Sequence, residues 1–172
     1  MTKIEEGRKF EKIALDHMKQ NNLSEAESNF LQALKHMQHS GDEEGQAYVL
    51  GNLGNLSFQS RRLDKAEEYY GKALTYMEKV NDVRGIESSL GNLGSVLFYK
   101  GKLDEAEEIY TKALKLLEDA NDNEGQSIYN ENLGNVYLKK DDLDAAEDYF
   151  NRAKILLDPD KNKDRIKQVD DK

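Results

Sequence analysis

Polar side chains recur at alternating four- and three-residue spacings along three segments of the chain, and they are the groups best placed to do chemistry. Four residues at these spacings share one face of a helix, because each residue turns the helix by about 100°. We call these residues, together with the equivalent positions near the N-terminus, the polar stripe. Its members are Tyr48, Asn52, Asn55, Gln59; Ser88, Asn92, Ser95, Tyr99; Ile128, Asn132, Asn135, Lys139; and Arg8, Lys12, Leu15, Lys19.

The asparagines of the polar stripe, Asn52, Asn92 and Asn132, stand forty residues apart. An amide side chain offers both a hydrogen-bond donor and an acceptor. The backbone of an extended peptide carries both groups on nearly every residue, so a row of amides can pair with it. Asparagine is a mediocre helix former, and its recurrence therefore indicates a role. That role is either peptide binding or the satisfaction of polar groups on neighbouring helices.

No other group of side chains has the pattern of a catalytic or metal site. His36 and His39 are one helical turn apart, a spacing that metal sites use, but no third ligand accompanies them. Glu67 and Glu68 belong to carboxylate pairs that recur in register, which is typical of a solvated helix face rather than of acid–base catalysis. We therefore predict no enzymatic activity, no cofactor and no metal site.

The composition excludes several other classes of protein. The chain has 172 residues, of which 34% are charged and 37% hydrophobic, with no cysteine and a net charge of -9. A disulfide framework is excluded, and no apolar run is long enough to span a bilayer. The acidic balance disfavours nucleic-acid and membrane partners. The opening sequence MTKIEEGRKF lacks the apolar core of a signal peptide, so we expect a cytoplasmic protein.

The whole chain is built from a forty-residue repeat. Leu23, Leu63, Leu103 and Leu143 each begin a similar segment with an alanine three residues later. Each repeat is predicted to hold two helices, exemplified by residues 64–80 and 83–100. The first of these has a single apolar face at three- and four-residue spacing, made of Ala66, Tyr69, Tyr70, Ala73, Leu74 and Met77.

Short dipeptides mark the ends of these helices. Glycine or asparagine followed by aspartate suits a left-handed residue after one helix and an N-cap for the next, at Gly41-Asp42, Asn81-Asp82 and Asn121-Asp122. We expect Asp104 and its equivalents to cap the second helix of each repeat. Glycine inside a helix costs about 1 kcal/mol relative to alanine, so we expect Gly51 and Gly54 to allow close approach of a neighbouring helix.

The repeat resembles the tetratricopeptide repeat, whose motif is W-x2-L-G-x2-Y followed by A-x3-F. The matching residues in one copy are Leu50, Leu53, Gly54, Ala66, Tyr70 and Ala73, and the match recurs from about residue 2 to residue 158. No copy has the tryptophan. The period is forty rather than thirty-four residues, which resembles the longer repeats of Pins-type polarity scaffolds and kinesin light chains.

This resemblance implies an all-α solenoid, a right-handed superhelix of four antiparallel helix pairs. We expect one solenoid domain over residues 1–160, with repeats at about 2–41, 42–81, 82–121 and 122–160. Residues 161–172 form either a charged tail or a short helix that caps the last repeat.

The resemblance also implies that the first helices of the repeats line a concave groove, which places the polar stripe inside it. We expect a non-enzymatic protein–protein interaction module that binds an extended peptide or a helix of a partner there. The residues expected to bind are Tyr48, Asn52, Asn55, Gln59, Ser88, Asn92, Ser95, Tyr99, Asn132, Asn135, Lys139, Arg8 and Lys12. The lysine of the family's two-carboxylate clamp is missing, so chaperone tails are not the expected ligand. The stripe is neutral in its middle, which suits a neutral or mildly acidic ligand.

A second function stays open. The chain is alternatively a structural module that associates with itself, as a dimer or end to end, through its terminal repeats. Exposed Tyr149, Ile155 and Leu156 would favour this if nothing covered the last repeat. We expect a monomer or a weak homodimer.

Overall fold

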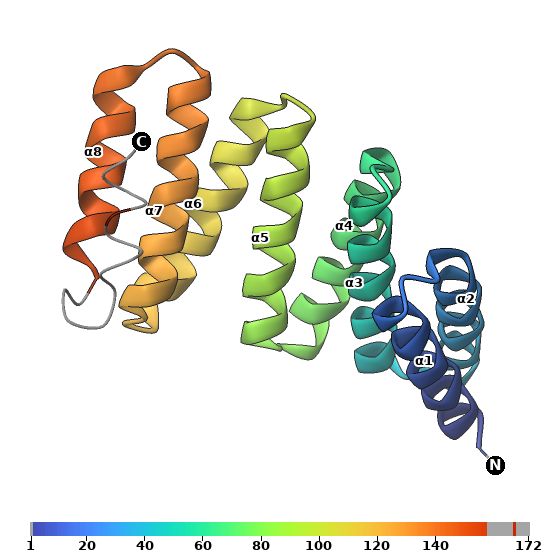
Figure 1. Ribbon diagram of the computed structural model, residues 1–172. Coiled ribbons are helices and arrows are strands. Elements are labelled where there is room, and N and C mark those ends of the chain that lie inside the picture. Colours follow the sequence, from blue (N-terminus) through green and yellow to red (C-terminus); the bar gives the residue numbers. More distant parts are fainter. Residues whose placement is uncertain (1, 158–166, 168–172) are drawn as a thin grey trace. The chain divides into compact units, whose positions relative to one another are not determined.

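The computed structural model describes residues 2–157 and residue 167, and the described chain folds into eight helices and no strand (Figure 1). A new helix begins about every twenty residues, so two helices make one forty-residue repeat. The predicted tail or capping helix at 161–172 lies outside the described residues, except for residue 167. The helices are α1 (Lys3–Lys19), α2 (Leu23–Ser40), α3 (Glu43–Gln59), α4 (Leu63–Val80), α5 (Val83–Tyr99), α6 (Leu103–Asp119), α7 (Asn123–Lys139) and α8 (Leu143–Ile155).

Every turn between these helices contains one residue with a left-handed backbone. At the second turn the Asp42 amide donates to the carbonyl of Met37 over 3.0 Å, and Gly41 between them has a φ of 70°. This arrangement satisfies carbonyl groups that the end of a helix leaves without partners. The left-handed residues stand twenty apart, at Asn21, Gly41, Arg61, Asn81, Gly101, Asn121 and Asp141.

Aspartate caps the first helix of the second, third and fourth repeats, as predicted. The carboxylates of Asp42, Asp82 and Asp122 accept from the backbone amide three residues later, over 2.9 to 3.1 Å. Thr2 forms a reciprocal capping box with Glu5.

The prediction that Asp104 caps a helix is wrong. Helix α6 begins one residue earlier, at Leu103, with Lys102 at the cap position and no side-chain hydrogen bond there. Asp104 therefore lies within the first turn, where a carboxylate still interacts favourably with the positive end of the helix dipole.

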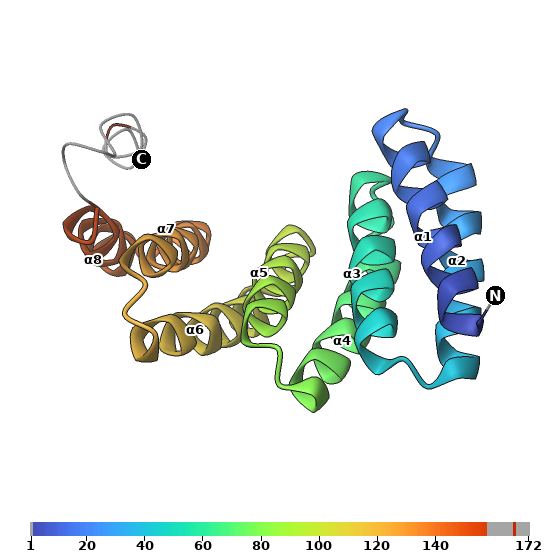
Figure 2. The ribbon, with the colours of Figure 1, turned by 90° about the horizontal axis from the view of Figure 1, so that it is seen from below.

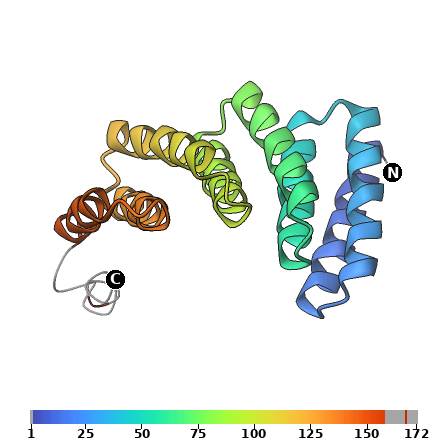
Figure 3. The same ribbon diagram turned by 90° about the horizontal axis from the view of Figure 1, so that it is seen from above.

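The described chain divides into two compact units, residues 1–96 and residues 97–172. The first, which we call the N-terminal unit, holds α1 to α4 and most of α5. Figure 2 shows α1 and α2 side by side along their length, with α3 next to α1. The second, the C-terminal unit, holds the end of α5 and α6 to α8, and Figure 3 shows α7 and α8 next to each other.

Both units consist of antiparallel helix pairs packed on one another, so the predicted all-α solenoid is confirmed. The right-handed superhelix and the single domain over residues 1–160 concern how the two units are joined, and they stay predictions. In the part of the chain that the structure describes, no helix is long and apolar enough to cross a bilayer.

Small residues on the second helices let the pairs pack closely. Ala26, Ala33, Ala66 and Ala73 are fully buried, and the large apolar residues Phe30 and Leu53 belong to the same core cluster as Ala26 and Ala33. In the C-terminal unit, Ala146 and Phe150 form the equivalent cluster, with Tyr137 packed against it.

The two glycines of α3 have opposite surroundings. A Cβ atom added at Gly54 would lie 2.5 Å from the ring of Tyr70, which confirms the predicted close approach. The prediction of close approach at Gly51 is wrong, because a Cβ atom there would meet no atom within 4 Å. Gly51 lies three residues from Gly54, on a part of the helix surface that no neighbour covers.

Candidate functional site

The polar stripe is accessible along its whole length. It runs along the first helix of each repeat, α1, α3, α5 and α7, and none of its residues is buried. The large side chains are especially open: Tyr48 is 46% exposed and Tyr99 59%. Side chains that served only to fill the space between helices would be covered, so this exposure favours an outward-facing role for the stripe.

Part of the stripe lines a cavity of about 250 Å³ in the N-terminal unit. Pockets for drug-sized ligands occupy roughly 300–1,000 Å³, so this cavity suits one or two amino-acid side chains with their backbone. Helices α3, α4 and α5 supply its walls. The lining residues are Ala47, Tyr48, Gly51, Asn52 and Asn55; Tyr70 and Met77; and Arg84, Gly85, Ser88, Ser89 and Asn92.

Five of the thirteen predicted binding residues meet at this cavity. They are Tyr48, Asn52, Asn55, Ser88 and Asn92. Two forty-residue equivalents, Asn52 and Asn92, thus face the same space from neighbouring first helices. The third asparagine of the row, Asn132, belongs to the C-terminal unit.

Tyr48 ties one wall of the cavity to the other. Its hydroxyl donates to Oδ2 of Asp82 over 2.8 Å, while Oδ1 of the same carboxylate caps α5 by accepting from the Gly85 amide. These hydrogen bonds, the one from Gly85 first, hold the pKa of Asp82 below its usual value. Tyr48 therefore has a structural role between repeats in addition to its exposure on the stripe.

Asn55 is oriented by a hydrogen bond from α4. The hydroxyl of Tyr70 donates to Asn55 Oδ1 over 2.7 Å. Burial raises the pKa of Tyr70 to about 12, so this hydroxyl stays protonated at neutral pH. Because the amide oxygen is occupied, the NH2 group of Asn55 is the part left to donate to a ligand.

Gly51 leaves helical backbone open beside these amides. It lines the cavity, and nothing lies within 4 Å of the place where a side chain would begin. A chain segment lying in the cavity can therefore come closer to α3 here than at any position carrying a side chain.

The C-terminal unit carries a different version of the stripe. The ammonium group of Lys139 lies 4.7 Å from the centre of the Phe98 ring, a cation–π contact. Ile128, at the position of Tyr48, is 42% exposed. Asn135 is equivalent to Asn55, but Phe150 replaces Tyr70 and has no hydroxyl to orient it.

Eight of the thirteen predicted residues do not line the cavity, and four of these, Arg8, Lys12, Gln59 and Ser95, lie on α1, α3 and α5. Gln59 donates to Asn21 in the first turn over 3.5 Å. Arg8 and Lys12 are exposed on α1, and Arg8 lies near the half-buried Glu11, whose pKa is raised mainly by burial. Ser95 donates to the carbonyl of Gly91 in its own helix.

Sequence reasoning missed Arg84, which lines the cavity from the first turn of α5. The sequence contained a signal for this residue. The equivalent positions in the neighbouring repeats are Glu44 and Glu124, so Arg84 carries the opposite charge to its equivalents in the preceding and following repeats. Arg84 is not part of the polar stripe because the stripe begins at position 48 and its equivalents, one helical turn later.

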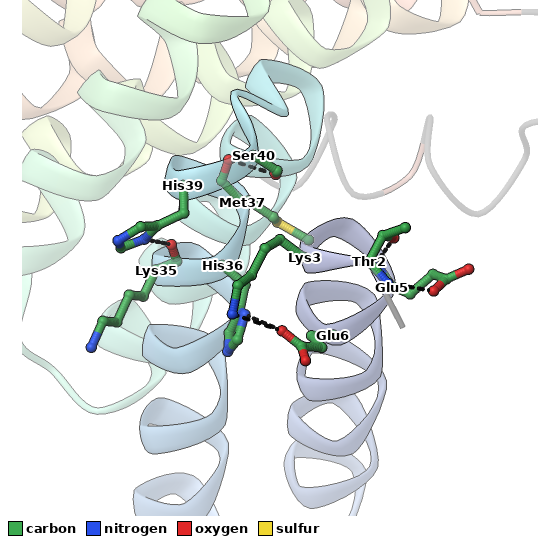
Figure 4. Close-up of polar contacts among 9 residues, drawn as sticks. All are labelled: Thr2, Lys3, Glu5, Glu6, Lys35, His36, Met37, His39 and Ser40. Carbon is green, nitrogen blue, oxygen red and sulfur yellow. Dashed lines mark hydrogen bonds and ion pairs between the residues drawn. The ribbon is translucent and has the colours of Figure 1, made fainter.

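The two histidines do not form a metal site. His36 reaches from α2 to Glu6 of α1, with 3.1 Å between Nδ1 and the carboxylate (Figure 4). Its ring stacks on Phe10. His39 instead contacts the carbonyl of Lys35 in its own helix. Among the described residues, no group of three or more His, Asp or Glu side chains has an arrangement that holds a metal ion.

Several solved structures share this fold. BtubC (BKLC) from P. vanneervenii is 26% identical, with a TM-score of 0.78 over 86% of this chain and 61% of that one. The apo form of RapI is 18% identical, with a TM-score of 0.83 over 94% of this chain and 58% of RapI. The chain thus spans about three fifths of the length of these two proteins.

A kinesin light chain-like protein of Podospora anserina with nearly identical TPR-like repeats is also similar. It is 13% identical, with a TM-score of 0.75 over 87% of this chain and 74% of that one. No curated protein sequence matches the chain.

The family model for the tetratricopeptide repeat matches residues 6–79 and 85–154, which is most of the sequence. Repeats of this family generally mediate interactions between proteins and are generally non-catalytic. The predicted family is confirmed: the chain belongs to the tetratricopeptide repeat proteins.

Proposed function

We propose that the chain binds an extended segment of a partner protein along its polar stripe, and that the cavity between α3 and α5 is the centre of this site. The observation that carries the proposal is the position of Gly51. A glycine in the middle of a helix costs about 1 kcal/mol relative to alanine. At Gly54 close packing against Tyr70 offsets that cost, but Gly51 faces open space.

The polar groups around Gly51 are those that a peptide backbone needs. Asn52 and Asn92 offer donors and acceptors from two adjacent first helices, and Asn55 presents its NH2 group because Tyr70 occupies its oxygen. An extended strand of a partner lying over Gly51 would pair its N–H and C=O groups with these amides.

The test is affinity capture from a lysate of the source cells, with the partners identified by mass spectrometry. The bait proteins are the wild type, the double variant Asn52→Ala/Asn92→Ala, and Asn151→Ala as a matched control on the exposed surface of α8. We expect partners that wild type and Asn151→Ala retain and that the double variant loses, with equal melting temperatures for all three. Identical partners for all three would mean that the asparagines are structural.

Self-association is a second candidate, and one feature of α8 favours it. Leu143 is 60% exposed and Ile155 82%, whereas Leu63, the equivalent of Leu143, packs against a core cluster. Tyr149 does not contribute, because it is half-buried and stacks on Tyr137. Light scattering over a concentration series would show a rising mass that Leu143→Lys/Ile155→Lys abolishes; a constant monomer mass would exclude this function.

A further inference from the structure

We propose that the cavity of the N-terminal unit selects partner segments that place a glutamate or aspartate side chain against Arg84. The inference rests on the proposed function and names the chemistry of the ligand. It begins from charge, because Arg84 is the one charged residue among those that line the cavity, and no carboxylate lines it. In a chain with a net charge of -9, the charged side chain that lines this cavity is thus a cation.

The guanidinium of Arg84 is free to bind. Within the part of the chain that the structure describes, its side chain makes no hydrogen bond and no ion pair. The carboxylate of Asp82 interacts with the backbone amide of Arg84 and with its charge, while the Gly85 amide donates to Oδ1 and the Tyr48 hydroxyl to Oδ2. The fold thus holds this carboxylate in hydrogen bonds to groups other than the guanidinium.

A carboxylate is the ligand that matches this geometry. The planar guanidinium presents paired N–H groups that meet both oxygens of a carboxylate. The exposed Ser88 lies one helical turn after Arg84 on α5 and lines the same cavity, so its hydroxyl is a further donor on that side. A basic or bulky apolar side chain would leave these donors without partners.

The partner backbone passes through the cavity rather than ending in it. Asn52, Asn55 and Asn92 line the cavity beyond Arg84 along α3 and α5, and each can pair with backbone groups of a segment that continues past Arg84. We therefore assign the carboxylate to a side chain within the segment and not to the C-terminus of a chain. Glu44 and Glu124 occupy the equivalent positions in the neighbouring repeats, so the acidic preference belongs to this cavity.

The probe is a displayed library of random twelve-residue peptides, selected on the wild type, Arg84→Glu and Gly51→Leu. We expect peptides selected by the wild type to share an aspartate or glutamate at one position. Arg84→Glu should select lysine or arginine at that position. Changing the acid of a selected peptide to its amide should weaken wild-type binding about tenfold and leave binding to Arg84→Gln unchanged.

Each alternative result has a distinct meaning. If Gly51→Leu no longer binds the selected peptides but Arg84→Glu still selects peptides with an acidic residue, the preference for an acid is refuted and the proposed groove is retained. Peptides that lose affinity only when their C-terminus is amidated would assign the carboxylate to a chain end and overturn the inference. Peptides that Gly51→Leu binds like the wild type, or no enrichment at all, would count against the groove itself and the inference with it.

Discussion

Gly51→Leu should stabilise the fold and abolish ligand binding at the same time. Most substitutions at a binding site lose affinity by damaging the structure, which leaves the two effects confounded. Gly51 offers the opposite case, because a side chain there meets no atom within 4 Å and projects into the cavity of about 250 Å³ that we assign to the ligand.

The size of the stabilisation follows from helix propensity. Leucine is favoured over glycine inside a helix by somewhat less than the full difference between alanine and glycine, so we expect a gain of about 0.5–1 kcal/mol in the free energy of unfolding. For a chain of this length, such a gain raises the melting temperature by roughly 1–4 °C. The leucine side chain would meanwhile occupy the space beside Asn52 and Asn55.

Gly71→Leu is the matched control. Gly71 lies in the middle of α4, where an added Cβ atom also meets nothing within 4 Å, but it does not line the cavity. Both variants should melt above the wild type in circular dichroism. In fluorescence anisotropy with a peptide selected on the wild type, only Gly51→Leu should lose binding.

Two results would refute this reasoning. A fall in the melting temperature of Gly51→Leu, with Gly71→Leu behaving as expected, would mean that the space beside Gly51 is not open. A more stable Gly51→Leu that binds the peptide with wild-type affinity would mean that the ligand lies elsewhere on the protein.

The remaining predictions concern stability and are measured by urea unfolding. Gly54→Ala should lose about 1–3 kcal/mol despite the better helix former, because its Cβ atom would crowd the buried ring of Tyr70; unchanged stability would contradict the packing. Ser57→Ala should be neutral or stabilising by up to about 1 kcal/mol, since this 1%-exposed hydroxyl has no hydrogen-bond partner among the described residues; a clear loss would show that the hydroxyl makes a stabilising hydrogen bond. Arg61→Gly should stabilise by about 0.5–1 kcal/mol, because the residue has a φ of 58°; a loss would show that the arginine side chain has a role. Hydrogen bonds, first from a lysine and then from a tyrosine, lower the pKa of Glu107 below 4.5. The contribution of this carboxylate to the free energy of unfolding is therefore complete above that pH, and it disappears as the pH falls through the lowered pKa. Glu107→Gln should make stability depend less on acid pH, and a parallel fall in the stability of variant and wild type would exclude this contribution.

Most of the fold could be predicted because its determinants repeat. A helix stop at Asn81 and a start at Asp82 follow from the local chemistry of asparagine and aspartate, and the same pair recurs at Asn121 and Asp122. The turn between the two helices of a repeat was harder to predict. Arg61 occupies a left-handed position there that its own residue type does not favour, so only the hydrogen bond from the following amide to the carbonyl of Ser57 identifies it.

The candidate site was predictable where it depends on periodicity and not where it depends on contacts between repeats. The four- and three-residue spacing placed Asn52 and Asn55 on one accessible face. The same spacing could not show that Tyr70 would fix the amide of Asn55, because these residues belong to different helices. The prediction of close approach at Gly51 was wrong for a similar reason. Whether a neighbouring helix covers a glycine depends on how the helices cross, which the sequence of a single helix does not determine.

Three register positions on the first helices, those of Gly54, Tyr48 and Arg84, show which residues serve packing and which vary between repeats. Gly54 and its equivalent Gly134 both lie against an aromatic ring of the following helix, and this contact is part of how each pair packs. Positions 48, 88 and 128 hold tyrosine, serine and isoleucine, and position 84 is arginine between two glutamates. Packing of the pairs does not require these differences, because the first helices α3, α5 and α7 have equivalent bounds and the same aspartate caps. We infer that residues that repeat build the solenoid, whereas those that break the repeat on its accessible face would distinguish one ligand from another, and Arg84 would make that distinction through its charge.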